Sequence, residues 1–270
     1  MLKFKNSAAN GQELFISGDI IDNADGESLA YWLDDKDYVN AKYNWPAAVK
    51  EQLDAMDQNK PVTVYINSDG GSVPAGVAIA NMLQRWKAPV TTVVEGWACS
   101  IATQIFFAGA IRKMPVNAYL MIHKPSGICN GDADDMRKAA ETLDVIQKGL
   151  ENIYKAAAKN ATPAEIHEMV NNETWLTGEE ACDMFDITPM APVQMAAKAS
   201  HASDGFKAIP KAIRNNLVKA EKNPAPSPQK EDPAKDPNGA NKDYIKKAIL
   251  NADKAIIKAA LIAAERQKHA

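Results

Sequence analysis

The chain has 270 residues with a 46% apolar fraction, which is enough for one large domain with appendages and a real core. A charged fraction of 24% is ordinary for a soluble globular protein, and a net charge of −3 gives no argument for nucleic acid or a membrane as a partner. The three cysteines are an odd number without a tight spacing, which favours reduced, cytosolic thiols over a disulfide framework or a metal site. The N-terminus lacks the apolar segment of a signal peptide, and no apolar run approaches the ~18 residues needed to span a bilayer.

The first half of the chain alternates expected strands with expected helices. Strands are predicted where apolar residues are β-branched or alternate with polar ones: residues 13–20, 62–66, 90–94 and 114–123. Helices are predicted where apolar residues recur at helical spacing: residues 47–56, 73–86 and 100–108. Such alternation predicts βαβ units and a mostly parallel sheet, which is an α/β fold.

A long helix is expected after a glycine-containing loop at residues 124–131. Residues 132–159 place their apolar side chains on one face at helical spacing. Thr162 is followed at once by a proline and then by an acidic residue, which is typical of a helix N-terminus. Thr177 begins a further expected helix, again with early carboxylates.

A change of composition past residue 190 divides the chain into three expected regions. Residues 1–190 form the folded domain. Residues 191–242 contain five prolines among charges between positions 221 and 241, and we expect a largely disordered linker. Residues 243–268 show an apolar stripe with lysines opposite, which predicts an amphipathic helix. Because an isolated helix of this length is marginal in water, we expect it to pair with itself or a partner; the alternative is a floppy, alanine-rich tail.

Three residues needed for nucleophilic catalysis occur in the order Ser100, His123, Glu173. A hydroxyl, an imidazole and a carboxylate form a nucleophile–base–orienter relay when they meet in space. Ser100 opens an apolar helix, whose dipole favours negative charge, although a serine there is also a common N-cap. His123 ends an apolar strand, where active sites of α/β folds gather, but it can also be structural. Glu173 lies between two expected helices and can simply be solvated.

A glycine pair gives a second candidate feature. Gly70 and Gly71 lie in residues 67–72, between an expected strand and an expected helix. Glycines permit positive φ, and exposed N–H groups at such a turn suit an oxyanion or a peptide backbone. The alternative is an ordinary strand-to-helix turn. Residues 98–102 lack the glycines of G-x-S-x-G, and the acid follows the histidine, so an α/β-hydrolase elbow is disfavoured.

Four motifs match one family in order and spacing. Residues 65–76 (Y-I-N-S-D-G-G-S-V-P-A-G) resemble Y-I-N-S-P-G-G-S-V-x-A-G, and residues 96–101 (G-W-A-C-S-I) resemble G-x-A-A-S-M. Residues 121–125 (M-I-H-K-P) resemble M-I-H-Q-P, and residues 175–181 (W-L-T-G-E-E-A) resemble F-L-S-A-x-E-A. These are motifs of ClpP-type serine peptidases, and the resemblance covers residues 13–188, about two thirds of the chain.

The resemblance implies a ClpP/crotonase-like α/β fold of repeated βαβ units, with residues 132–159 as a protruding handle helix. It implies hydrolysis of polypeptide substrates without a cofactor or metal, by a homo-oligomer assembled as a ring. At the matching positions Ser100 is the nucleophile, His123 the general base and Glu173 the acidic third member, in a slot where most of the family has aspartate.

Four further positions match the backbone contacts that the family makes with substrate. The N–H groups of Gly71 and Ile101 fall at the oxyanion hole, and Gly70 and Ser72 fall in the substrate-binding turn. Asp69 replaces the proline of the family motif, which leaves this turn less fixed.

One branch of the family shares further features with this chain. The run E-T-W-L-T-G-E-E-A at residues 173–181 and F-K-N at residues 4–6 look like phage prohead (head maturation) proteases. Residues 171–174 (N-N-E-T) lack the Asp-Arg pair that housekeeping members of the family use across their ring interface. We therefore expect a serine endopeptidase that processes capsid or scaffold proteins during virion maturation, inside an assembling prohead in the host cytoplasm.

Three alternatives stay open. One is a housekeeping degradative subunit that works with an ATPase unfoldase, and another is a non-catalytic assembly scaffold. A Ser–Lys dyad using Lys124 is the third, and it is disfavoured because Lys124 and His123 are neighbours on a strand and point to opposite faces.

Overall fold

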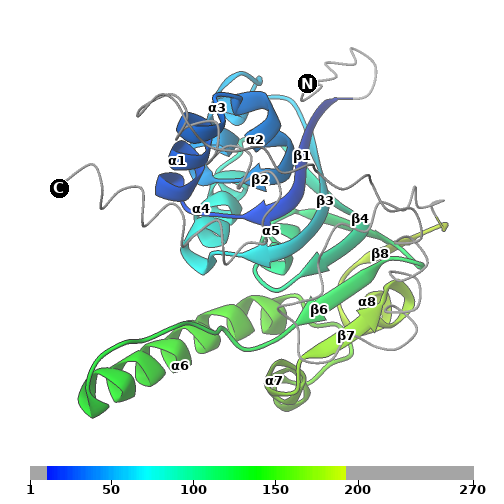
Figure 1. Cartoon of the computed structure of the whole chain (residues 1–270). Coiled ribbons are helices and arrows are strands. Elements are labelled where there is room, and N and C mark those ends of the chain that lie inside the picture. The colour runs from blue at the N-terminus through cyan, green and yellow to red at the C-terminus, as the bar shows by residue number, and fades with distance from the viewer. Residues whose placement is uncertain (1–10, 193–270) are drawn as a thin grey trace, which may run out of the picture.

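Eight strands of the described residues form one sheet, and helices pack against it (Figure 1). The computed structural model describes residues 11–192, so nearly all of the expected linker (191–242) and the whole expected C-terminal helix (243–268) lie outside the described residues. The strands are β1 (Gln12–Ile20), β2 (Tyr43–Asn44), β3 (Val62–Gly71), β4 (Val90–Cys99), β5 (Ile111–Pro115), β6 (Tyr119–Ile122), β7 (Thr174–Thr177) and β8 (Thr188–Met190). The helices are α1 (Asn23–Leu33), α2 (Lys36–Lys42), α3 (Pro46–Asp54), α4 (Val73–Gln84), α5 (Ala102–Phe107), α6 (Ala133–Ala156), α7 (Pro163–Asn171) and α8 (Gly178–Met184). The expected α/β fold is confirmed.

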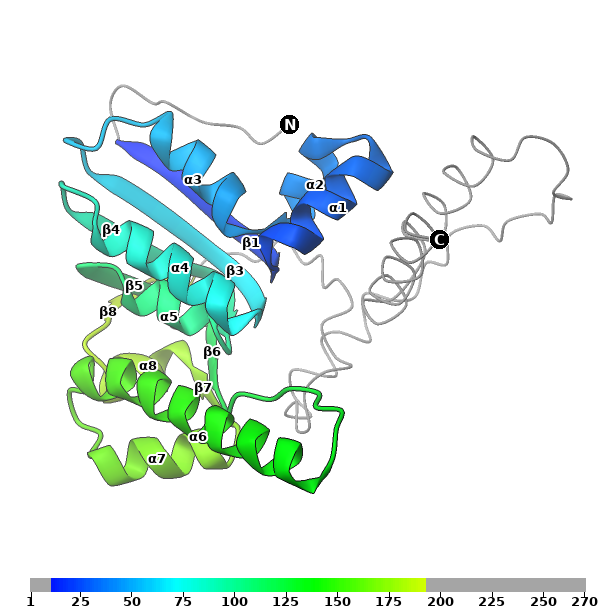
Figure 2. The same cartoon turned by 90° about the vertical axis from the view of Figure 1, so that its left-hand side faces the viewer.

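The sheet is parallel apart from one pair of strands. Its order is β2-β1-β3-β4-β5-β8, and β6 pairs with β4 on one side and with β7 on the other. Among the paired strands of residues 11–192, only β6 and β7 run antiparallel to each other. Parallel neighbours need crossover connections, and α3, α4 and α5 lie along one face of the sheet as such connections (Figure 2). The start of β4 pairs with β5 and its end with β6, so the last residues of β4 and β6 lie side by side.

The main hydrophobic core lies between the sheet and the helices on this face. Along β3, Val62, Val64 and Ile66 are buried at alternate positions, as the two-residue period of a strand requires. Ile79 of α4 and Ile105 of α5 are fully buried in the same cluster.

Within residues 11–192 three helices begin with capping boxes, in which the N-cap side chain accepts from the N3 backbone N–H and the N3 side chain accepts from the N-cap backbone N–H. Thr162 with Glu165 caps α7, and Thr177 with Glu180 caps α8. Asp132 caps α6 in the same way. The helix starts predicted at Thr162 and Thr177 are confirmed, and each box satisfies backbone donors that the helix itself leaves unpaired.

Helix α6 is the expected protruding handle. It has 24 residues, and its far part, residues 133–145, is mostly exposed and extends away from the sheet (Figures 1 and 2). Its near end enters the core through Leu150 and Tyr154. No helix within residues 11–192 is both long and apolar enough to span a bilayer.

Several expected elements differ from the structure. The strand expected at 114–123 is two strands, because Ala118 N–H donates to Pro115 O and closes a turn between β5 and β6. Most of the turn expected at 67–72 is instead part of β3, which continues to Gly71. Gly70 and Gly71 have positive φ there, and the register of β3 with β1 shifts just before them. Helices α1 and α2 and the short strands β2, β7 and β8 were not expected.

Candidate active site

Ser100 and His123 are brought together by the pairing of β4 with β6. Cys99 lies opposite Met121 in the parallel register, and Ser100 N–H donates to Met121 O at 2.9 Å. Ser100 therefore follows the end of β4 just where His123 follows the end of β6. Their side chains meet, with Ser100 Oγ 2.8 Å from His123 Nε2. This distance is that of a hydrogen bond between a nucleophile and its general base.

Ser100 makes its turn in a conformation that L-residues rarely adopt. Its φ is +55°, in the left-handed region, which costs roughly 1–2 kcal/mol for a residue with a side chain. Its carbonyl oxygen accepts hydrogen bonds from Thr103 N–H at 3.0 Å and from Thr103 Oγ1 at 2.5 Å. These bonds, with the bond from Ser100 N–H to β6, hold the sharp turn between β4 and α5.

Glu173 is brought to His123 by strand β7, which was not expected. In the antiparallel register of β6 with β7, Ile122 lies opposite Thr174, so the next pair outward is His123 with Glu173. His123 Nδ1 is 3.8 Å from Glu173 Oε2. Both side chains are largely buried, with exposed fractions of 20% and 13%. At 3.8 Å this pair of atoms is too far apart for a direct hydrogen bond, but it is within ion-pair distance when the imidazole is protonated.

The two glycines of β3 pack against different neighbours. Gly70 has φ +95°, and an added Cβ would lie 2.8 Å from Ser100 Cβ and 3.2 Å from Ile101 N. Gly71 has φ +140°, and a Cβ there would lie 2.0 Å from the carbonyl oxygen of Ile20 on β1. The backbone of β3 therefore passes directly beside Ser100, at an approach that only glycine permits.

The Ser72 side chain serves the start of α4. Its Oγ donates to Asp22 Oδ1 at 2.7 Å and accepts from Ala75 N–H at 3.4 Å. The hydroxyl thus caps α4 and ties it to Asp22, the N-cap residue of α1. The backbone N–H of Ser72 donates to Ile20 O at the end of β1.

Two other reactive side chains, Cys99 and Lys124, adjoin Ser100 and His123 in the chain. Cys99 precedes Ser100 but is fully buried, and burial, with the nearby charges of Asp69 and Glu173, raises the pKa of its thiol well above the usual value. A protonated, buried thiol is a poor nucleophile. Lys124 is exposed. Within residues 11–192 no group of three or more His, Cys, Asp or Glu side chains is placed to hold a metal ion.

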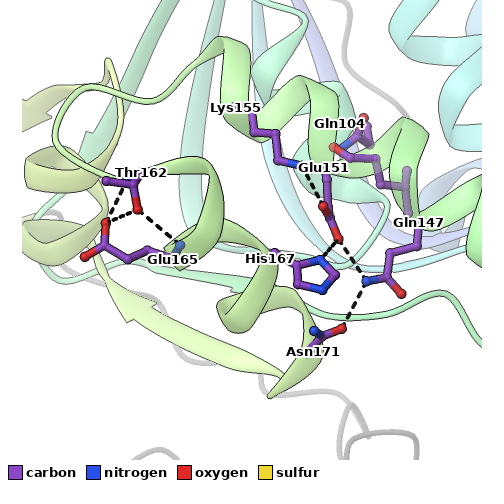
Figure 3. Close-up of polar contacts among 9 residues, drawn as sticks. Gln104, Gln147, Glu151, Lys155, Thr162, Glu165, His167 and Asn171 are labelled. Atoms are coloured by element: carbon purple, nitrogen blue, oxygen red, sulfur yellow. Dashed lines mark hydrogen bonds and ion pairs between the residues drawn. The ribbon is translucent and has the colours of Figure 1, made fainter.

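A second polar cluster links α6 to α7 and was not anticipated. Glu151 is buried, and its carboxylate accepts from Gln147 Nε2 at 2.8 Å, from His167 Nδ1 at 2.8 Å and from Lys155 Nζ at 2.7 Å (Figure 3). Burial alone would raise the pKa of Glu151, but these hydrogen bonds lower it from 4.5 to about 2. Gln147 also donates to Asn171 at the end of α7, two residues before Glu173.

Comparison with known proteins assigns the family. A family model described as Clp protease matches residues 47–184, just over half of the chain. The chain belongs to the Clp protease family. This Clp protease chain is 40% identical over 132 residues to an ATP-dependent Clp protease proteolytic subunit of Streptococcus gordonii. It is 41% identical over 134 residues to the protein of the same name from Streptococcus equi subsp. equi. Each match covers 47% of this chain and 67% of the relative.

Family membership makes the chain a serine-type endopeptidase. The matched residues run from α3 to the end of α8 and include the ends of β3, β4 and β6. The hydrogen-bonded Ser100 and His123 are therefore inside the part of the chain that is similar to other Clp proteases.

Proposed function

We propose that Ser100, His123 and Glu173 are the catalytic triad of this peptidase. The observation that carries the proposal is the 2.8 Å contact of Ser100 Oγ with His123 Nε2, with the other ring nitrogen directed to Glu173. Ser100 Oγ attacks the scissile carbonyl carbon while His123 Nε2 takes its proton. His123 then gives that proton to the leaving amine, which leaves an acyl ester on Ser100. A water molecule, deprotonated by His123, hydrolyses the ester and restores the serine.

The oxyanion of each tetrahedral intermediate is assigned to the N–H groups of Gly71 and Ile101. Support comes from the approach of β3 to the nucleophile turn, where a Cβ on Gly70 would lie 3.2 Å from Ile101 N. Donors fixed by the backbone need no reorganisation as negative charge develops on the oxygen. Gly70 and Ser72 would lie along the bound peptide backbone.

The proposed substrate is a capsid or scaffold protein of a phage prohead, cut during head maturation by a homo-oligomeric ring. Residues 173–181 support this assignment through their likeness to the prohead branch. Residues 171–174 add support, since they lack the Asp-Arg pair of the housekeeping ring interface, and the Asn171 side chain accepts a hydrogen bond from Gln147 of its own chain. Residues 1–190 would be the protease domain, with residues 191–242 as a linker and residues 243–268 as a docking helix.

A second candidate function is favoured by the names of the relatives. Those proteins are called ATP-dependent Clp protease proteolytic subunits, so this chain is equally a candidate for a degradative subunit that works with an ATPase. The two functions differ in what they require: the prohead protease cuts its partner without ATP, and the degradative subunit needs an unfoldase for folded substrates.

Mass spectrometry of the chain co-expressed with a capsid protein tests the proposal. Wild type should cut the capsid protein at defined sites without ATP, and Ser100→Ala should leave it intact. Ser126→Ala, which removes an exposed serine from the loop after His123, is the matched control and should cut as wild type does. Equal cutting by Ser100→Ala would end the triad assignment, and cutting that depends on an added ATPase unfoldase would favour the second candidate.

A further inference from the structure

Two buried hydroxyl groups lie between α5 and α6, and the mechanism above does not use them. Thr103 of α5 is fully buried and Tyr154 of α6 is 2% exposed. Thr103 Oγ1 is 2.6 Å from the Tyr154 hydroxyl oxygen and 2.5 Å from the carbonyl oxygen of Ser100. Burying hydroxyls costs free energy unless they are hydrogen-bonded, and here each one finds its partner in this short series.

The direction of the two hydrogen bonds follows from the chemistry of the three groups. A carbonyl oxygen only accepts, so Thr103 must donate its proton to Ser100 O. The Thr103 oxygen is then left as an acceptor, and Tyr154 donates to it. Burial raises the pKa of Tyr154, which keeps its hydroxyl protonated and able to donate. The series therefore runs from Tyr154 to Thr103 to the backbone of Ser100.

The series acts on a residue whose backbone is strained. Ser100 has φ +55°, and its orientation determines whether Oγ reaches His123 Nε2 at 2.8 Å. Its N–H is held by Met121 O on β6, and its C=O by Thr103. Thr103 donates two hydrogen bonds to the Ser100 carbonyl oxygen, one from its side chain and one from its backbone N–H. Loss of the side-chain bond would leave only the backbone bond between these two residues.

The far end of the series is fixed in α6, the helix that follows the loop after His123. Tyr154 packs edge-to-face on Phe107 with ring centroids 5.8 Å apart. Beside it, Gln104 of α5 lies next to α6 (Figure 3), and its Nε2 donates to Leu150 O at 3.5 Å. Helix α6 is thus connected to Ser100 by the hydrogen bonds of Tyr154 and Thr103, and to His123 by the loop that precedes the helix.

We propose that Thr103 and Tyr154 are positioning residues for the nucleophile: their hydroxyl series links α6 to the Ser100 carbonyl and keeps Ser100 Oγ in line with His123. The proposal rests on the role of Ser100 proposed above. It predicts that a shift of the handle helix α6 changes the position of Ser100 Oγ, because moving Tyr154 away from Thr103 loosens the Ser100 turn.

The test measures kcat and KM for a small peptide ester, together with the rate at which a fluorophosphonate labels Ser100. Thr103→Val should lower kcat about tenfold with KM unchanged, since about 1.4 kcal/mol of lost positioning is one factor of ten. Tyr154→Phe should lower kcat by a smaller factor. Because the bonds act in series, the double variant should be no slower than Thr103→Val alone. Thr103→Ser keeps the hydroxyl and should restore kcat.

Thr92→Val is the matched control for the loss of a buried hydroxyl. Thr92 Oγ1 donates to Phe106 O at 2.7 Å, at the other end of α5, so this variant should lose thermal stability but keep kcat. If Thr103→Val and Tyr154→Phe keep the kcat of Thr92→Val, or if Thr103→Ser fails to restore activity, the positioning role is wrong while the triad stands. If wild type is not labelled at Ser100, the proposed function and this inference fall together.

Discussion

The buried carboxylate of Glu151 makes a sharp prediction about stability and pH. Its side chain is 4% exposed and receives hydrogen bonds from three donors on α6 and α7. Since its pKa is lowered from 4.5 to about 2, the folded state binds its proton only at much lower pH than the unfolded state. The stabilisation is therefore fully present above pH 4.5 and is lost as the pH falls towards 2.

The size of the effect follows from the shift. A difference of this size between folded and unfolded pKa is worth about 3 kcal/mol in total, at about 1.4 kcal/mol for each pH unit. Of this, about 2 kcal/mol should disappear between pH 6 and pH 3. Glu151→Gln removes the titrating group, so the advantage of wild type over this variant should shrink by that amount over the same range.

Denaturant unfolding of both proteins at several pH values is the assay. Glu168→Gln removes an exposed carboxylate from α7 and controls for the change in net charge. If the difference in unfolding free energy between wild type and Glu151→Gln stays constant from pH 6 to pH 3, the assignment of a strongly lowered pKa to Glu151 is refuted.

Three further predictions concern backbone and charge at single positions. Gly70→Ala should lower the unfolding free energy by about 2 kcal/mol or more and slow the labelling of Ser100, because the added Cβ would lie 2.7 Å from the Cys99 carbonyl oxygen. Gly127→Ala is the control, since a Cβ there meets nothing within 4 Å, and it should change neither quantity. Thermal melts and fluorophosphonate labelling measure the two effects. Gly149→Ala, in an open position inside α6, should raise the unfolding free energy by about 0.5–1 kcal/mol in denaturant titrations. Glu173→Gln should lower kcat for a peptide ester by about a hundredfold or more with KM little changed; an unchanged kcat would remove Glu173 from the triad.

Much of the strand and helix order was predictable because it depends on local patterns. Apolar spacing located β3, α4 and α6, and the N-cap residues Thr162 and Thr177 located two helix starts. Helices α1 and α2 were missed because their small separate cluster, built on residues such as Leu33 and Trp45, leaves no long apolar period in the sequence.

The candidate site was only partly predictable. Ser100 and His123 each follow an apolar run, so their position at strand ends was visible in the sequence. The approach of Glu173 depends on β7, a strand of four residues that is too short to give a period, and on its register with β6. Thr103 and Tyr154 were hidden because they lie on apolar faces, where a sequence pattern does not distinguish a core position from a buried hydrogen bond.

Mass spectrometry after fluorophosphonate treatment tests the central claim, that Ser100 is the nucleophile activated by His123, most directly. Wild type should carry one adduct, on the peptide that contains Ser100, and both Ser100→Ala and His123→Ala should lose that adduct while keeping the circular dichroism spectrum of wild type. A wild-type protein without an adduct, or an adduct of equal yield in Ser100→Ala, would contradict the claim.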